Sequence, residues 1–327
     1  MVRIVDPTTN NSKYRIRYGL ILISIAVVAG LVVVFDQYEQ AVISRQATET
    51  LQRYVTRDLL KEEIGGSSSI GESNNNAPQE EQATAACPLL HTSKVAVPEI
   101  VIDKTAIRAQ SKEKLNQLKQ FTVPAYEQYM MSEPGQEHYT LWHYLTKTYH
   151  SPENDCRHVV DIGTRYTASA LALGAMGGIE VQTFDIPSSR ERLSAFRGKS
   201  EEEWQRQLQS AEHNVHLKFH NLDLLTISDD DFRSYMSTWL IIVDTFHLPY
   251  KNPFEREWLD RLVNMEPTFE GIVMLDDIHL NPEMRMWWKE VQDNALNWGF
   301  VAHDVTSVGH VSGTGLLDFS GKVRIVE

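Results

Sequence analysis

The feature that most constrains the fold is a strand, a tight turn and a small-residue helix between His158 and Gly178. The apolar run 159–162 carries an acid near its end and enters the turn at Gly163, where the helix follows at once. A second strand ends in Asp185, roughly twenty residues after the turn. This order predicts the opening strand–helix–strand unit of a nucleotide-type cofactor site.

The length and charge of the chain limit the classes of protein it can belong to. Its 327 residues are 42% hydrophobic, which is enough for one large folded domain. The formal net charge is -13, and a protein that binds nucleic acid backbones needs a basic surface, so we expect no nucleic acid partner. Two cysteines, Cys87 and Cys156, leave open whether they pair or stay reduced.

An uncharged apolar segment at residues 18–35 predicts a transmembrane helix. Basic residues precede it and acidic residues follow it, which predicts a single-pass type II protein with residues 1–17 in the cytosol. The short span favours the membranes of the ER and Golgi. A cleaved signal peptide and a buried core helix are the alternatives, and the long charged leader favours an uncleaved signal-anchor.

Residues 36–105 are expected to form a stem between this span and the folded domain. Apolar residues at helical spacing in 37–64 predict a helix, with homodimer formation through it as a weaker expectation. Residues 65–86 are rich in Gly, Ser, Asn, Gln and Glu and predict a flexible tether. The segment 87–105 is ambiguous, with a strand-like run at 95–102.

We expect residues 106–327 to fold as an α/β domain with an N-terminal helical lid. Strands that alternate with helices indicate a mostly parallel sheet with helices on both faces. The last two strands are joined by a short turn, so that pair must be antiparallel. The predicted strands are 158–162, 180–184, 215–220, 239–243, 271–275, 299–305 and 314–319. The predicted helices are 106–120, 124–131, 136–149, 168–176, 200–211, 229–237, 254–264 and 282–297.

Carboxylates stand at the ends of the fourth and fifth predicted strands of the sheet. Asp244 ends the fourth strand, and Asp276 and Asp277 end the fifth. Because the carboxyl ends of neighbouring parallel strands open into one crevice, these side chains should converge. Three carboxylates repel one another unless something neutralises them, and oxygen ligands favour a hard divalent cation. An acid at one strand end is often only a helix cap, so the prediction depends on all three.

Five strand–helix units that end in an antiparallel hairpin resemble the class I S-adenosylmethionine-dependent methyltransferases, from about residue 136 to 327. Within that superfamily the chain looks most like the metal-dependent O-methyltransferases of catechol and sugar hydroxyls. The resemblance implies a Rossmann-like, seven-stranded, mostly parallel sheet with an antiparallel last strand. It also implies a transferase whose acceptor is a hydroxyl. The predicted lumenal location of the domain makes a glycan or a small molecule the expected acceptor.

The resemblance implies that S-adenosylmethionine binds at the first strand–helix turn. Asp161 would take its ammonium group, Asp185 its ribose hydroxyls and Asp223 its adenine amino group. Gly163 is expected where a Cβ would block the ligand. With Thr164, these residues form the expected cofactor site.

The turn departs from the family by carrying Tyr166, Thr167 and Ala168 where glycines are usual. S-adenosylmethionine has no phosphate and needs less bare backbone than NAD, so this departure favours it over NAD.

The resemblance also implies magnesium held by Asp244, Asp276 and Asp277. A bound metal lowers the pKa of a coordinated hydroxyl and orients it toward the methyl group. His247, three residues beyond Asp244, would be the general base, and these two residues are the expected catalytic pair. The roles of His279 and His310 stay open between contacts within the site and solvated loop positions.

Two other classes of function stay open. Golgi-type glycosyltransferases hold a metal with an Asp-x-Asp motif, which 229–231 matches, although these acids fit a helix start better. A membrane-tethered binding module that kept the fold and lost catalysis is the second, because fold does not imply function. The pair 287–288, two tryptophans at helical spacing with Met284, predicts core packing rather than a substrate platform.

Overall fold

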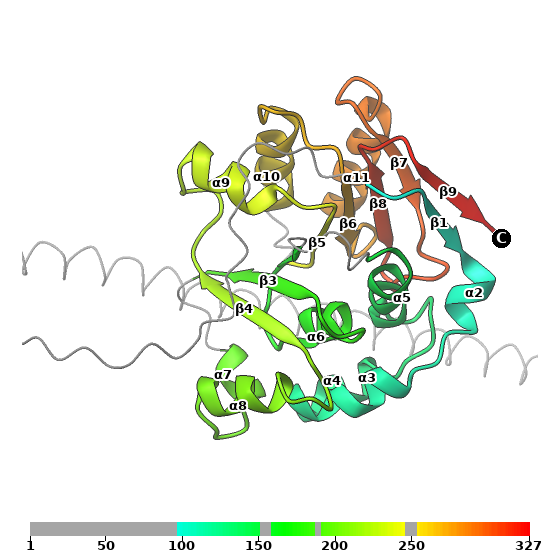
Figure 1. The fold of residues 1–327 in the computed structure, drawn as a ribbon. Helices are drawn as coiled ribbons and strands as arrows, with labels where there is room; N and C mark the ends of the chain where they lie inside the picture. The colour runs from blue at the N-terminus through cyan, green and yellow to red at the C-terminus, as the bar shows by residue number, and fades with distance from the viewer. Residues whose placement is uncertain (1–96, 151–157, 187–190, 246–253) are drawn as a thin grey trace, which may run out of the picture. The chain divides into compact units, whose positions relative to one another are not determined.

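The structure is a computed structural model, and the residues it describes all fall within the unit Gln82–Glu327 (Figure 1). The predicted tail and span, most of the predicted stem, both cysteines and His247 lie outside the described residues. The residues described are 97–150, 158–186, 191–245 and 254–327.

A seven-stranded sheet forms the centre of the unit, in the order β4-β3-β2-β5-β6-β8-β7 (Figure 1). The pairs from β4 to β6 are parallel, and β8 runs antiparallel to both of its neighbours. The predicted mostly parallel sheet with an antiparallel last strand is therefore confirmed. Its strands are β2 (His158–Ile162), β3 (Glu180–Asp185), β4 (His216–Asn221), β5 (Leu240–Val243), β6 (Ile272–Asp276), β7 (Val301–Asp304) and β8 (Thr314–Asp318).

Helices cover both faces of this sheet, as its strand residues require. Successive residues of a strand point to opposite faces, and Val159 and Val160 accordingly belong to two different hydrophobic clusters. The helices α3, α5, α6 and α8 supply the first cluster, and α9, α10 and α11 supply the second. Trp287 and Trp288 are buried in the second, which confirms their predicted core role. The helices are α2 (Lys104–Arg108), α3 (Glu113–Leu118), α4 (Pro124–Tyr129), α5 (Tyr139–Tyr149), α6 (Ala168–Gly174), α7 (Glu191–Ala195), α8 (Glu201–Leu208), α9 (Asp229–Met236), α10 (Phe254–Val263) and α11 (Pro282–Asn294), with a 3-10 turn η2 (Lys119–Phe121).

The acids at 229–231 form the first turn of α9, as their interpretation as a helix start predicts. Ser228 caps the helix, and its hydroxyl accepts a hydrogen bond from the backbone N–H of Asp231 at 3.1 Å. Asp229 pairs with Arg261 at 2.6 Å, and Asp230 pairs with Arg233 at 2.8 Å. These carboxylates are placed at the positive end of the helix dipole, and two of them have arginine partners.

The N-terminal part of the described chain differs from its prediction. A two-stranded parallel sheet joins β1 (Ile100–Asp103) to β9 (Val323–Val326), so residues before 106 belong to the folded unit. The single helix predicted for 106–120 is three short elements, α2, α3 and η2. Asp103 starts α2 by accepting from the N–H of Ala106 at 2.9 Å, and the polar residues 110–112 interrupt the helical pattern.

The predicted location, a single-pass type II protein of the ER or Golgi, is withdrawn. Within the described ranges, the structure contains no helix that is long and apolar enough to cross a bilayer. The segment 18–35 itself lies outside those ranges. The predictions of a membrane anchor and of a homodimer through the stem helix are withdrawn as well.

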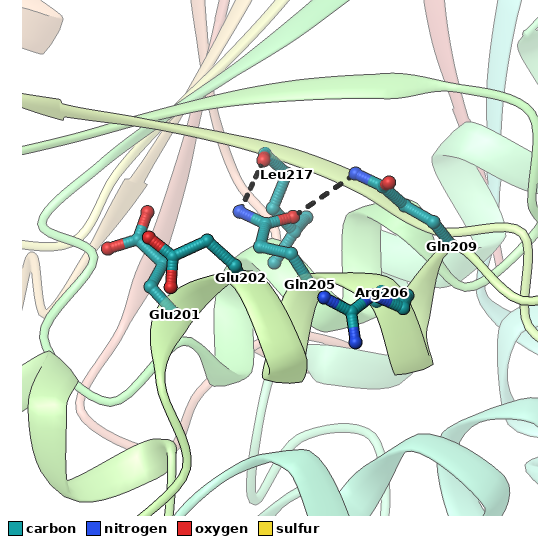
Figure 2. A pocket seen from close by; sticks show the side chains of 6 residues that line it. All are labelled: Glu201, Glu202, Gln205, Arg206, Gln209 and Leu217. Atoms are coloured by element: carbon teal, nitrogen blue, oxygen red, sulfur yellow. Dashed lines mark hydrogen bonds between the residues drawn. The ribbon is translucent and has the colours of Figure 1, made fainter. Parts of the chain in front are cut away.

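A surface hollow between α8 and β4 lies apart from the strand ends discussed below (Figure 2). The Gln205 side chain crosses it, with its Nε2 donating to the carbonyl of Leu217 at 2.8 Å and its Oε1 accepting from Gln209 at 3.4 Å. Because Leu217 lies near the beginning of β4, whereas the predicted site residues follow the carboxyl ends of strands, this hollow is not part of the candidate site. Its lining residues are Glu201, Glu202, Gln205, Arg206, Gln209 and Leu217.

Candidate active site

The register of the sheet places Gly163, Asp244 and Asp276 side by side at the carboxyl ends of β2, β5 and β6. Ile162 is aligned with Val243 across β2 and β5, and Val243 is aligned with Leu275 across β5 and β6. The residues that directly follow these three aligned positions are Gly163, Asp244 and Asp276. The expected convergence at the carboxyl ends follows directly from this alignment.

Gly163 is required by its neighbouring strand. Its φ is +102°, and a Cβ placed on it would stand 1.8 Å from the carbonyl oxygen of Asp244. Its N–H donates to the carbonyl of Phe184 at 2.8 Å, while the N–H of Asp244 donates to that of Ile162 at 2.9 Å. From the sequence, glycine was expected here because a side chain would block the ligand. The structure gives a second reason, because a side chain would also collide with the backbone at Asp244.

Asp161 is a fully buried carboxylate. It is aligned with Thr183 across the parallel pair β2–β3, and the Thr183 hydroxyl donates to its Oδ2 at 2.7 Å. Burial raises the pKa of Asp161 to about 6, against the opposing effect of the Thr183 hydrogen bond. The Ser169 hydroxyl also lowers this pKa, but Oδ1 makes no hydrogen bond of good geometry with any described residue. This oxygen is therefore suited to a positively charged partner.

The other predicted cofactor residues follow β2, β3 and β4. The Thr164 side chain is buried, and its hydroxyl bonds to that of Thr183, so it extends the hydrogen-bonded chain to Asp161. Asp185 is half-buried, and its two oxygens accept from the N–H groups of Arg165 at 3.2 Å and Ile186 at 2.8 Å.

Asp223 lies in the turn after β4, two strands from β2. Its Oδ1 accepts from the N–H of Leu225 at 2.9 Å. Asp185 and Asp223 thus follow the adjacent strands β3 and β4.

Two histidines flank the buried carboxylate of Asp276, which is 3% exposed. His138 Nδ1 lies 3.2 Å from its Oδ1, and His310 Nδ1 lies 3.3 Å from its Oδ2. Asp244 approaches His138 Nε2 at 3.9 Å, and Asp277 approaches His310 Nδ1 at 3.1 Å. The acids predicted to meet thus do so around two imidazoles.

These side chains form three overlapping groups whose ligand atoms lie within 4.8 Å of one another. Every one of these groups contains a histidine, and none of them combines the three predicted carboxylates. The three predicted carboxylates are thus divided among mixed sets of carboxylate and imidazole. They are Glu137 with His138 and His310, His138 with Asp244 and Asp276, and Asp276 with Asp277 and His310.

The charges of this cluster shift the pKa values of its members in a consistent way. Burial alone would lower the pKa of His138 and His310, but their contacts with Asp276 outweigh it, raising both and bringing that of His310 to about 11. Burial alone would raise the pKa of Asp276, and the two histidines bring it well below its usual range. Burial raises the pKa of Glu137. Without a bound cation, protonated imidazoles neutralise the carboxylates.

Two loops distant in sequence hold these histidines in place. His138 immediately precedes α5, and His310 lies in the connection between β7 and β8. The N–H of Gly135 donates to the carbonyl of Gly309 at 2.9 Å, and the N–H of Val311 donates to that of Gln136 at 3.3 Å. The two histidines are therefore carried by segments that are bonded to each other.

Sequence reasoning missed His138 and left His310 undecided. The only local signal for His310 is its place between glycines next to the last strand, and His138 has none beyond preceding a helix. His279 lies elsewhere, in an ion pair with Asp304 at 2.8 Å. His247, the predicted base, lies outside the described residues.

No family model matches this chain, and no curated protein matches it. Solved structures do resemble it at low identity. One from Klebsiella pneumoniae, provisionally named an O-methyltransferase, is 12% identical, with a TM-score of 0.39 over 66% of this chain and 94% of that one. One from Staphylococcus aureus, provisionally named a caffeoyl-CoA O-methyltransferase, is 13% identical, with a TM-score of 0.35 over 55% and 81%.

Human N-acetylserotonin methyltransferase in complex with SAM is 14% identical, with a TM-score of 0.34 over 65% of this chain and 58% of that one. Likenesses with such TM-scores carry no conclusion about the family or the activity of this chain.

Proposed function

We propose that this chain is an S-adenosylmethionine-dependent O-methyltransferase acting on a hydroxyl of a small molecule. The observation that carries the proposal is the contact between the backbones of Gly163 and Asp244. It sets the predicted cofactor turn against the strand end that leads into the carboxylate cluster. Methyl transfer needs this juxtaposition, because the donor and the acceptor oxygen must meet in line at short distance.

The residues of the turn fit S-adenosylmethionine. The buried Asp161 Oδ1 makes no hydrogen bond of good geometry with any described residue and would take an ammonium group. Asp185 and Asp223 follow the next two strands, and their carboxylates would accept from the ribose hydroxyls and the adenine amino group. When bound, this cofactor supplies an electrophilic methyl group on a sulfonium.

The residues of the cluster fit a divalent cation. Asp244, Asp276 and Asp277 supply carboxylate oxygens, and the buried Asp276 Oδ1 makes no hydrogen bond of good geometry with any described residue. These three residues would hold the ion, magnesium or a similar one, whose charge lowers the pKa of an acceptor hydroxyl. Our expected base remains His247, which would take the hydroxyl proton.

The acceptor is proposed only as a hydroxyl of a small molecule. A glycan acceptor followed from a lumenal location, and that location is withdrawn. The glycosyltransferase alternative relied on the acids at 229–231, which start α9 and of which Asp229 and Asp230 pair with arginines. No observation on the described residues favours it.

Calorimetric titration of the full chain with S-adenosylmethionine tests the proposal. We expect saturable binding that Asp185→Ala abolishes. The matched control is Asp293→Ala on the exposed face of α11, which should bind as the wild type does. A folded wild-type chain that binds no S-adenosylmethionine would overturn the proposal. Binding without methyl transfer to any hydroxyl acceptor would instead support the inactive binding module.

A further inference from the structure

We infer that the cation centre at Asp276 is a mixed nitrogen–oxygen centre, with His138 as a ligand beside Asp244 and Asp276. This inference rests on the proposed function in one respect, the presence of a cation at Asp276. It adds an imidazole ligand that the sequence did not indicate. It also changes the class of ion, from magnesium to a divalent cation of the first transition row such as Mn²⁺ or Zn²⁺.

The first observation is a buried imidazole whose ring nitrogens lack hydrogen bonds. His138 is 2% exposed, and neither of its ring nitrogens makes a hydrogen bond of good geometry with any described residue. The Asp276 Oδ1 that faces it also makes no hydrogen bond of good geometry with any described residue. A buried polar atom without a well-formed hydrogen bond is destabilising, so an ion bound by both residues would stabilise this part of the structure.

The second observation is the spacing of the three side chains. His138 lies 3.2 Å from Asp276 and 3.9 Å from Asp244, through different ring nitrogens, and one ligand atom from each residue lies within 4.8 Å of the others. Ligand atoms bound at about 2.0–2.2 Å around one tetrahedral ion are roughly 3–4 Å apart. The three side chains are thus nearly at ligand spacing.

The third observation is that packing fixes the His138 ring. The ring stacks on Trp142, one turn further along α5, with centroids 4.7 Å apart and planes at 28°. It also contacts Tyr139, with centroids 4.5 Å apart. Sites held by packed side chains need little rearrangement to bind. The imidazole is therefore oriented before any ion arrives.

The choice of ion follows from the ligand types. Magnesium prefers oxygen ligands and keeps several waters, whereas imidazole suits zinc, iron and related ions. One imidazole with two carboxylates therefore favours a transition-row ion over magnesium, and Mn²⁺ is a convenient probe because it is paramagnetic.

The decisive measurement uses the unmodified full chain. After removal of metal by a chelator, Mn²⁺ is added and pulsed electron paramagnetic resonance is recorded. We expect modulation from an imidazole ¹⁴N bound directly to Mn²⁺. Mn²⁺ binding without this modulation would overturn the inference in favour of an all-carboxylate centre. A folded chain that binds no Mn²⁺ would also overturn it and leave the cluster as an ion-pair network.

A pair of variants assigns the nitrogen to His138. His138→Asn should weaken Mn²⁺ binding on the order of 100-fold and remove the ¹⁴N modulation. His143→Gln is the matched control, a buried histidine of α5 outside the three groups, and it should change neither. Modulation that persists in folded His138→Asn would assign the nitrogen to another residue and overturn the inference. If that variant does not fold, His310→Asn is measured instead, and loss of the ¹⁴N modulation there would assign the nitrogen to His310 and overturn the inference.

The proposed function is tested separately in the same preparations. S-adenosylmethionine binding is measured without metal, where it depends on Asp161 and Asp185 rather than on the cluster. Loss of cofactor binding would therefore overturn the methyltransferase proposal, whereas loss of the ¹⁴N signal alone would overturn only the ligand assignment.

Discussion

The carbonyl oxygen of Asp244 occupies the space that a side chain on Gly163 would need, 1.8 Å from the position of its Cβ. The predicted cofactor turn and the strand end that leads to the carboxylates are thus in backbone contact. A shift of either one would move the other, so the stability of this edge and the geometry of the candidate site depend on the same pair of residues.

Gly163→Ala is expected to lower the free energy of unfolding by roughly 2–4 kcal/mol, because the new Cβ meets backbone that cannot rotate away and φ is positive. Urea denaturation measures the effect. Gly198→Ala is the control, since its φ is +81° but nothing lies within 4 Å of its Cβ, and it should cost only about 1 kcal/mol. Equal losses in the two variants would contradict the steric explanation.

Asp161→Asn is expected to change how stability depends on pH. The folded pKa of about 6 lies above the unfolded value of 3.8, so the stabilisation from the protonated carboxyl is complete below the unfolded value and lost as pH rises through about 6. Relative to the wild type, the variant should gain on the order of 2–3 kcal/mol between about pH 4 and pH 8. Denaturation curves of both proteins across this interval measure the difference, and parallel curves would argue against a raised pKa.

Thr183→Val tests the hydrogen-bonded chain from Thr164 through Thr183 to Asp161. The substitution keeps the shape of the side chain but removes the Thr183 hydroxyl, which donates to the buried carboxylate. We expect a loss of about 1–3 kcal/mol near pH 8 and a further rise in the pKa of Asp161. Thr183→Ser retains the hydroxyl and should keep the pKa of Asp161 at its wild-type value. A Val variant as stable as the Ser variant would show that the hydroxyl is dispensable.

His143→Gln is expected to flatten the acid side of the stability profile. Burial lowers the pKa of His143 to about 4, while an unfolded chain takes up this proton near pH 6.5. Between these values the unfolded state binds more protons, so wild-type stability falls as pH falls, by an amount on the order of 3 kcal/mol. Chemical denaturation from pH 7 down to about pH 4 should show a smaller fall in the variant. An unchanged slope would mean that other groups account for the acid sensitivity.

The sheet could be predicted from the sequence because its signals are local. Short apolar runs, the turn at Gly163 and the acids at strand ends specify the strands and their shared edge, and Asp244 and Asp276 lie at that edge as expected. The prediction for 106–120 was less accurate, because helical periodicity indicates which residues face the core and not where a chain bends between them. Ile107 and Leu115 are both buried, yet they belong to separate helices.

The ligand set could not be predicted in full because it is assembled by tertiary structure. His138, Asp276 and His310 come from three segments far apart in the chain, and no spacing rule connects them. The strand-end rule identifies acids at the carboxyl edge but cannot identify side chains that reach this edge from a preceding helix or from the connection between antiparallel strands. His138 was therefore missed, although it is the most buried member of the cluster.

The pairing of β1 with β9 has a consequence for biosynthesis. Ile100 is aligned with Val323, so the first described strand must wait for the synthesis of more than 200 further residues before its partner exists. Ile100 and Ile102 are fully buried in the folded unit, and until β9 appears they lack the partner strand that covers them. Closure of so long a loop is slow, and an unpaired apolar strand is prone to aggregate in the interval. We therefore expect β1 to need chaperone protection during synthesis for longer than the strands of the central sheet do.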